Sequence, residues 1–187
     1  MTNKLSKIRF KDYYINTIQL DNLTKFNLIN IHKQTNIKKI ILNFSFNSIN
    51  FNKKKAIPFF MALELITNQK NKINKSKKPT MVLKIRKGSM VGCSVTLQNE
   101  NLYNFYEYLL LALSRSENFQ GFSIKNFNNL PGNTFSFVMD DLFNFYQVEA
   151  DLNNAIKMLD ITFLFNTNSR EEKIFLISSY KIPILEK

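Results

Sequence analysis

The sequence is poor in the residues that usually carry chemistry in a small protein. Its 187 residues include one cysteine, Cys93, which excludes an internal disulfide framework and a zinc site built from several cysteines. The single histidine, His32, has no second histidine with which to hold a metal. No apolar run approaches the roughly 20 residues that cross a bilayer. We therefore expect no metal, no cofactor and no transmembrane segment.

Glycine and proline are equally scarce, with four of each, and we find no internal repeat and no Gly/Ser linker. Apolar residues make up 44% of the chain, so the composition favours a folded domain over a disordered basic tail. Each glycine or proline is expected to mark a turn or the end of an element. We expect one folded domain over residues 38–187, preceded by a polar, partly helical extension over residues 1–37.

Acidic residues are nearly missing from the first half of the chain. Residues 1–99 hold 19 lysines and arginines against three acids, whereas residues 100–187 hold seven against eleven. Between Asn68 and Asn99 there are eight cations and no acid. A folded protein with one strongly basic half suggests a polyanionic partner, either nucleic acid or an acidic membrane. A charge bias that only improves solubility is the plain alternative.

Hydrophobic periodicity predicts an α+β protein. The expected strands cover residues 38–46, 119–139 (interrupted by a turn at 131–133) and 158–167. The expected helices cover residues 53–67, 100–114 and 169–177. Because strands and helices do not alternate regularly, we expect a mixed or antiparallel sheet with helices packed mainly on one face.

Local signals set the expected helix ends. Asn52 is a plausible cap for the helix over 53–67, in which Pro58 is tolerable only within the first turn. Ser169 and Glu172 have the spacing of a capping box, which should begin the last helix.

The basic stretch predicts a β-hairpin that is mounted next to a flexible loop. Residues 81–87 and 91–97 both alternate with period two, and Gly88 and Gly92 could supply positive φ in the connection. One face of this hairpin is apolar, and the other would present Lys84, Arg86, Ser94 and Thr96. The preceding residues 70–79 show neither period, so we expect a protruding basic loop there.

The run from Thr67 to Leu97, with "GCSVTL" at its end, resembles the large-subunit ribosomal protein that binds 5S rRNA, protein five in its series. Downstream, "LYNFYEYLLLALSR", "NFQGFSIKNFNNLPGN" and "LDITF" resemble later blocks of the same family in the same order. The resemblance covers roughly residues 38–177. Some family positions differ, since its Gly-x-Gly after the first strand is Ser45–Ser48 here.

This resemblance implies a structural constituent of the large ribosomal subunit, without enzymatic activity. It implies a place in the central protuberance, contact with 5S and large-subunit rRNA, contact with the peptidyl-site tRNA, and a neighbour in the small-subunit head. The residues expected to contact tRNA are Lys70, Lys72, Lys75, Lys77 and Lys78. The residues expected to contact rRNA are Asn43, Lys54, Gln69, Lys84, Arg86, Ser94, Thr96 and Arg115.

Lysine outnumbers arginine 22 to 4, and asparagine, isoleucine and phenylalanine are plentiful, as AT-rich codons favour. We therefore expect an organelle-encoded protein of a mitochondrial ribosome, in preference to a plastid.

Other classes of function stay open on sequence alone. A free-standing RNA- or DNA-binding protein could use the same basic half. A nuclease would need converging acids with a metal or a histidine base, but the acids lie in the other half of the sequence. A peripheral membrane protein would need a basic amphipathic helix, whereas these cations lie on a loop and hairpin.

Overall fold

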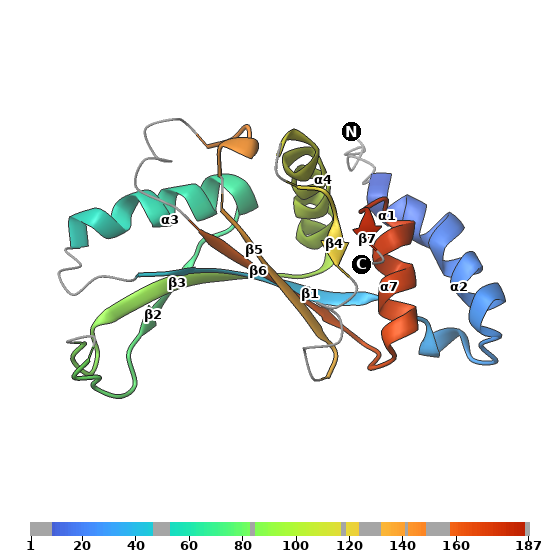
Figure 1. Ribbon diagram of the computed structural model, residues 1–187, viewed down its shortest axis with the longest axis horizontal. Helices are drawn as coiled ribbons and strands as arrows, with labels where there is room; N and C mark the ends of the chain where they lie inside the picture. The colour runs from blue at the N-terminus through green and yellow to red at the C-terminus, as the bar shows by residue number, and fades with distance from the viewer. Residues whose placement is uncertain are drawn as a thin grey trace, which may run out of the picture. The chain divides into compact units, whose positions relative to one another are not determined.

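A computed structural model describes most of the chain (Figure 1). The described residues are 9–46, 53–82, 85–116, 119–123, 132–140, 142–148 and 158–185, without the side chains of 53–55 and 143. No helix among these residues is long and apolar enough to cross a membrane.

The helical segments are α1 (Arg9–Tyr13), a π-helical turn (Tyr14–Ile18), α2 (Gln19–Phe26), a 3-10 turn (Ile31–Lys33), α3 (Lys53–Thr67), α4 (Asn99–Arg115), a 3-10 turn (Leu142–Asn144) and α7 (Arg170–Ser179). The strands are β1 (Ile37–Ser45), β2 (Lys72–Lys75), β3 (Met90–Leu97), β4 (Phe122–Ser123), β5 (Thr134–Met139), β6 (Leu159–Phe165) and β7 (Ile184–Leu185).

Five strands form one sheet in the order β2-β3-β1-β6-β5, and β4 pairs in parallel with β7 in a second, two-stranded sheet. This arrangement confirms the α+β class. Within the expected strands over residues 119–139, the described ones are β4 and β5, and β4 pairs with the C-terminal β7. Residues 124–131 lie outside the described residues, but Gly132 has the positive φ of +89° expected near a turn.

The chain divides into two compact units, each assembled from segments that are far apart in the sequence. The first comprises Met1–Ile40, Gln98–Ser136 and Phe163–Lys187, and the second Ile41–Leu97 and Phe137–Thr162. The expected boundary between residues 37 and 38 stays a prediction.

The first unit is built around aromatic side chains. Tyr106 and Tyr180 are almost fully buried, with ring centroids 4.8 Å apart, and Tyr14 stacks on Tyr180 at 6.3 Å. Phe163 meets Tyr106 edge-on at 6.2 Å. Large rings bury much apolar area per residue, so this cluster forms the centre of the unit.

The N-terminal segment is more regular than its polar sequence suggests. Helical backbone runs without interruption from α1 through the π-helical turn into α2, where Tyr14 and Ile18 are buried. The Tyr14 hydroxyl donates a hydrogen bond to the Thr35 carbonyl at 3.0 Å. The segment therefore packs as part of the first unit, with α2 against α7.

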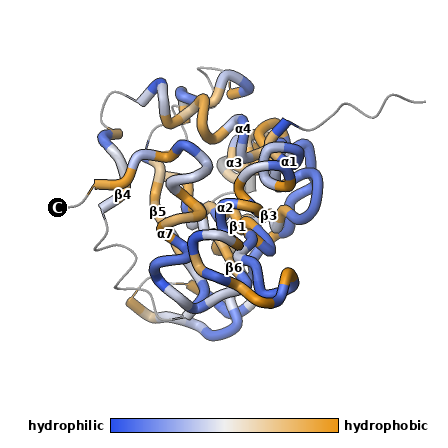
Figure 2. Tube along the Cα trace, turned by 90° about the vertical axis from the view of Figure 1, so that its right-hand side faces the viewer, coloured by the Kyte–Doolittle hydropathy of each residue, from blue (hydrophilic) through white to orange (hydrophobic). Residues whose placement is uncertain are grey.

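The second unit packs α3 against β3. Leu63 and Ile66 of α3 are buried, as are Leu42 and Phe44 of β1. Figure 2 colours the chain by hydropathy and shows where hydrophobic and hydrophilic residues follow one another. The expectation for Pro58 is wrong, since it lies inside α3 beyond the first turn, where it removes one helical hydrogen bond. The expected cap, Asn52, lies outside the described residues.

The other two helices follow their sequence signals closely. In α4, Leu102, Phe105, Tyr106, Leu109 and Leu113 are buried, whereas Leu110 is only half-buried. Ser169 is the N-cap residue of α7, but its side chain makes no capping hydrogen bond. Instead Glu172, the expected second half of the capping box, accepts a hydrogen bond of 2.7 Å from the Thr35 hydroxyl.

Candidate nucleic-acid interface

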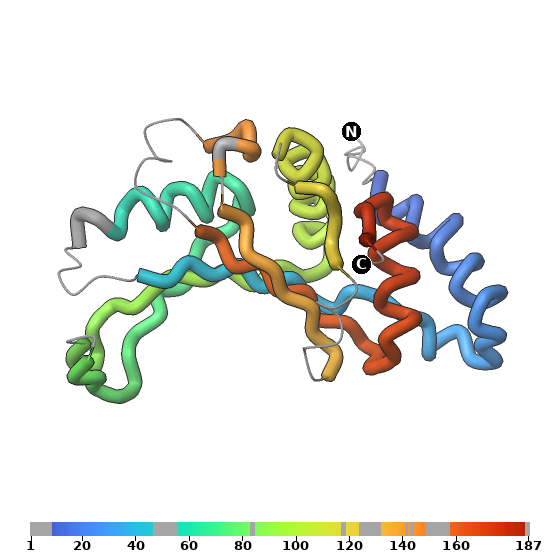
Figure 3. Tube along the Cα trace, viewed as in Figure 1, coloured from blue at the N-terminus to red at the C-terminus, as the bar shows by residue number. Residues whose placement is uncertain are grey.

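The basic stretch does form a hairpin, but its first strand is not the expected one. β2 pairs antiparallel with β3, Lys72 opposite Ser94 and Ile73 opposite Cys93 (Figure 3). The expected strand over 81–87 is wrong, because Met81 and Val82 are 95% and 87% exposed in a turn. The reason is that β3 can pair with only one strand on this side, and β2 occupies that edge.

The connection over residues 76–89 is held by backbone hydrogen bonds. The Ser76 amide donates to the Ser89 carbonyl at 2.9 Å, extending the ladder beyond β2. Further out, Thr80 and Ile85 exchange two bonds of 3.0 Å, which close the tip of the loop. Gly88 has φ +83° as expected, and residues 76–89 form a second, smaller hairpin set on the first. The loop expected over residues 70–79 is wrong in its first half, since Lys72–Lys75 form strand β2.

The cations of this hairpin point into solvent. Lys70, Lys72, Lys75, Lys77, Lys78 and Arg86, all expected to contact RNA, are exposed. Within the part of the chain that the structure describes, none of them forms an ion pair with a carboxylate. Lys84 lies outside the described residues. Charge that no acid compensates creates a positive potential suited to phosphate.

A row of polar side chains crosses the sheet beside these cations, and we call it the polar ladder. The Ser94 hydroxyl donates to Asn74 Oδ1 at 3.1 Å, and Asn74 Nδ2 donates to Asn43 Oδ1 at 3.2 Å. Asn43 Nδ2 in turn donates to Asp160 Oδ2 at 3.3 Å. Neighbouring strand residues point to opposite faces, so the ladder lies on the face away from buried Cys93.

Gly92 makes the polar ladder possible. Asn74 and Asn43 lie on β2 and β1 with β3 between them, and Gly92 is the β3 residue opposite Asn74. With no side chain there, the two amides can meet across the middle strand. A Cβ on Gly92 would also collide with the Phe44 carbonyl oxygen of β1. The expected positive φ at Gly92 is wrong, since the glycine is needed for close approach.

The remaining expected contact residues are more scattered. Gln69 is half-buried after α3, and its amide donates to the Thr96 carbonyl at 3.5 Å, while the Thr96 side chain is exposed. Lys54 belongs to α3, but its side chain lies outside the described ones. Arg115 is exposed at the end of α4 and belongs to the first unit, whereas the hairpin belongs to the second.

Sequence reasoning missed Asn74 and Asp160. Asn74 belongs to "KINK", which is too short and polar to show strand periodicity, and Asp160 lies within an apolar run. Their position in the polar ladder depends on strand order. One signal for Asn74 was present. It lies two residues after Lys72, so in a strand the two side chains would share one face.

Among the described residues of the interface, the side chains show no arrangement suited to catalysis. Burial raises the pKa of Cys93 to about 12, so its thiol stays protonated at neutral pH. His32 is exposed in its 3-10 turn. Among the residues described, no group of three His, Cys, Asp or Glu side chains could hold a metal.

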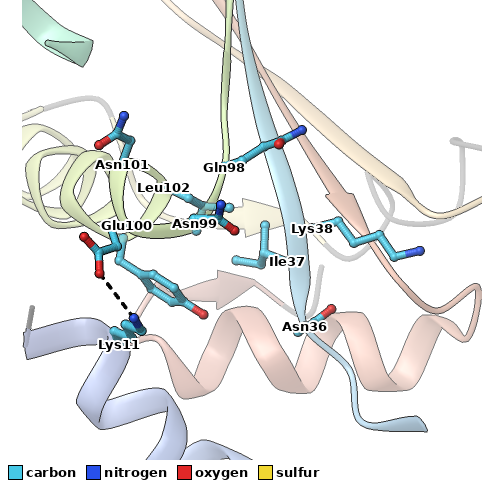
Figure 4. Close-up of a pocket in the computed structure, with 10 residues that line it drawn as sticks. Lys11, Asn36, Ile37, Lys38, Gln98, Asn99, Glu100, Asn101 and Leu102 are labelled. Atoms are coloured by element: carbon cyan, nitrogen blue, oxygen red, sulfur yellow. Dashed lines mark hydrogen bonds and ion pairs between the residues drawn. The ribbon is translucent and has the colours of Figure 1, made fainter. Parts of the chain in front are cut away.

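A hollow of about 730 Å³ lies elsewhere, in the first unit (Figure 4). Asn36 and Lys38 at the start of β1 line it, together with Gln98, Asn99 and Asn101 at the start of α4. Lys11 and Glu100 form an ion pair of 3.4 Å beside it. The hollow is open and none of the hairpin cations lines it, so we do not assign it to the interface.

These features define a class first: an α+β protein that presents exposed cations and ordered amides on one hairpin, suited to binding a polyanion. Residues 90–184 match the ribosomal L5P family C-terminus. The chain is 33% identical over 178 residues to the large ribosomal subunit protein uL5c of Oedogonium cardiacum, covering 95% of this chain and 98% of that protein. It is 32% identical over 179 residues to uL5m of Reclinomonas americana, covering 94% and 97%.

A bacterial relative, uL5 of Wolbachia sp. subsp. Brugia malayi (strain TRS), is 33% identical over 178 residues, covering 95% and 99%. The chain belongs to the L5 family of large-subunit ribosomal proteins, structural and non-enzymatic components of the ribosome. The resemblance noted from sequence is thereby confirmed. Since the matches cover 95% of the chain, they include most of the first 37 residues.

Proposed function

We propose that this chain binds 5S rRNA and large-subunit rRNA in the central protuberance of its ribosome and contacts the peptidyl-site tRNA. The observation that carries this proposal is the hairpin itself, where exposed cations lie beside Asn74 and Ser94, the part of the polar ladder on β2 and β3. Cations supply affinity for any phosphate backbone, while ordered amides and hydroxyls can discriminate the shape of a folded RNA.

The polar ladder and its neighbours suit rRNA. Asn43, Ser94 and Thr96 offer donors and acceptors that can reach 2′-hydroxyl, phosphate or base-edge atoms, and Gln69 lies beside Thr96. Because Asn43 and Ser94 are already held by hydrogen bonds, less side-chain entropy is lost when RNA binds. Lys54, Lys84, Arg86 and Arg115 would add phosphate contacts.

The lysines of the hairpin suit tRNA. Lys70, Lys72, Lys75, Lys77 and Lys78 are flexible point charges that tolerate any tRNA sequence, because phosphates carry no sequence information. Neutralising several phosphates releases counterions, so this contact should weaken steeply as salt rises.

The compartment we propose is the mitochondrion, in an organelle-encoded ribosomal protein. The support is the composition, with 22 lysines against four arginines, and the similarity to a mitochondrial relative. The chloroplast and bacterial relatives are equally similar, and the AT-rich composition supports an organelle in general. The proposed partners are rRNA, peptidyl-site tRNA, adjacent large-subunit proteins and a protein of the small-subunit head.

Sedimentation distinguishes this function from a free-standing RNA-binding protein. An epitope-tagged chain should travel with large subunits when an organelle lysate is centrifuged through a gradient, and should stay with them after a wash in moderate salt. A chain that remains at the top of the gradient, bound to short RNA, would establish the alternative.

A charge-neutralised loop tests the tRNA contact. We expect Lys77→Gln with Lys78→Gln to leave sedimentation with large subunits unchanged but to weaken binding of peptidyl-site tRNA by about tenfold, near 1.4 kcal/mol. The matched control is Lys33→Gln with Lys181→Gln, which removes equal charge from exposed positions outside the hairpin. Equal tRNA affinity in the two double variants would remove the tRNA role.

A further inference from the structure

Helix α3 is apolar on both of its faces. One face, including Leu63 and Ile66, is buried against the sheet of the second unit. The opposite face carries Ile57, Met61 and Leu65, which are 52%, 50% and 41% exposed. These three follow one another at a spacing of four residues, so they form a continuous stripe along the helix, which we call the α3 ridge.

Such a helix is unusual at a protein surface. An ordinary surface helix turns charged or polar residues outward, and a helix that is apolar all round is normally covered on both sides. Glu64 is the acid of this outer face, and its Oε1 accepts a hydrogen bond of 3.4 Å from the backbone N–H of Asn71. The α3 ridge therefore has the pattern of a covered surface.

Charge around the ridge identifies the kind of partner. Residues 53–87 contain eleven lysines and arginines and one acid, Glu64. Lys70 and Lys72 are exposed just beyond the end of α3. A partner that covers the ridge must supply apolar side chains to the stripe and negative charge to its surroundings.

Other occupants fit this chemistry less well. Aliphatic side chains offer RNA neither a donor nor a ring on which a base could stack, so the ridge is unlike the hairpin. A second copy of this chain would bring another net charge of +12 against the same basic surroundings. Three aliphatic residues are also a short stripe for lying in a membrane interface.

We propose that the α3 ridge docks an amphipathic helix of another protein, one whose apolar stripe is flanked by aspartate and glutamate. The helix lies along Ile57, Met61 and Leu65, and its acids face Lys70 and Lys72 beyond the end of α3. This mode of recognition needs three or four apolar anchors in register. The apolar docking does not depend on the hairpin's contact with tRNA, but the partner's acids and tRNA would compete for Lys70 and Lys72.

The test uses the full purified chain and a labelled peptide of about 18 residues, five helical turns, with leucine on one face and glutamate on the other. A second peptide replaces every glutamate by lysine. We expect the acidic peptide to bind at least tenfold tighter than the basic one, and Met61→Glu or Leu65→Glu to weaken it by about tenfold or more.

The matched control is Leu111→Glu. Leu111 is an isolated apolar residue of α4 that is 50% exposed, as Met61 is. This variant should bind the acidic peptide as the unaltered chain does, and circular dichroism should show all three variants folded. Equal peptide affinity in the Met61→Glu and Leu111→Glu variants would overturn the proposal.

Three further outcomes would contradict the proposal by assigning a different partner to the α3 ridge. Self-association that Met61→Glu abolishes would indicate a second copy. Binding to phosphatidylserine vesicles that Met61→Glu abolishes would indicate a membrane. Displacement of the acidic peptide by a short RNA duplex, in a chain with a neutralised loop, would assign the ridge to RNA.

A photocrosslinker in place of Met61 tests the same surface in assembled particles, with position 111 as control. We expect an adduct to a protein segment that is both acidic and amphipathic. Particles that contain the chain but give only an RNA adduct, or none, would reject the ridge while leaving the proposed ribosomal function intact. If the chain is absent from particles but still binds the acidic peptide, the proposed ribosomal function would be rejected and the ridge would be retained.

Discussion

The aromatic cluster of the first unit and the hairpin of the second show two different uses of the chain. Around Tyr14, Tyr106 and Tyr180, ring packs on ring and the phenols are buried. On the hairpin, cations are exposed and polar side chains bond to one another across the strands. The cluster should therefore determine stability, and the hairpin should determine binding.

Removing a ring from the aromatic cluster should have the largest effect. We expect Tyr180→Ala to lower the free energy of unfolding by about 4 kcal/mol, because it leaves a cavity between Tyr106 and Tyr14. Urea denaturation followed by circular dichroism measures this. Tyr180→Phe keeps the packing and should cost about 1 kcal/mol; if the two variants were equally unstable, ring packing would not be what holds this unit.

A side chain at Gly92 tests whether the stability of the hairpin depends on the close approach of β3 to β1 at this residue. Gly92→Ala places a methyl against the Phe44 carbonyl and should cost about 3 kcal/mol. Gly88→Ala is the control, since nothing lies within 4 Å of its added methyl and only its positive φ of +83° is unfavourable. That variant should cost about 1 kcal/mol by urea denaturation, and the reverse order would contradict the close-approach argument.

Interrupting the polar ladder should have a smaller effect on stability. Asn74→Ala leaves the Ser94 hydroxyl without its acceptor and Asn43 Oδ1 without its donor, at an expected cost of about 1 kcal/mol. Lys72→Ala, on the same strand with an exposed side chain, should change the free energy of unfolding by less than about 0.5 kcal/mol. Equal urea midpoints in the two variants would show that the ladder does not stabilise the hairpin.

Alkaline pH should lower the stability of both regions, because each contains a buried group that can lose a proton, a phenol in the first unit and a thiol in the hairpin. Burial raises the pKa of Tyr14 from 10.0 to about 12 and that of Cys93 from 9.0 to about 12. A folded-state pKa above the unfolded value means that the unfolded chain loses its proton first. Stability should therefore be complete below about pH 9 and should fall between about pH 9 and 12.

Urea midpoints at a series of pH values measure this dependence. Burial also raises the pKa of Tyr103, Tyr106 and Tyr180, and Tyr14→Phe removes one member of this set. Its stability should therefore fall less steeply between about pH 10 and 12 than that of the unaltered chain. An unchanged slope would show that Tyr14 does not contribute. Cys93 should also resist thiol reagents at mildly alkaline pH until urea unfolds the chain, since its side chain is fully buried.

Local pattern predicted several elements closely. The strand expected over 38–46 is β1, and the last expected strand is β6, because β-branched and aromatic alternation is a property of neighbouring residues. Helix α4 and its buried stripe follow for the same reason. The N-terminal helices were underestimated because their polar residues hide the few apolar contacts, such as Ile18, that hold them.

The sequence by itself determined the α+β class, the family, and the concentration of charge between Asn68 and Asn99, since all of these follow from residue order along the chain. Only the tertiary structure decided that β2 rather than residues 81–87 pairs with β3, that Asn74 meets Asn43 above Gly92, and that α3 leaves a second apolar face outward. The physical reason is that a strand's partner, and the face on which a side chain is buried, depend on contacts between segments far apart in sequence, which local propensity does not encode.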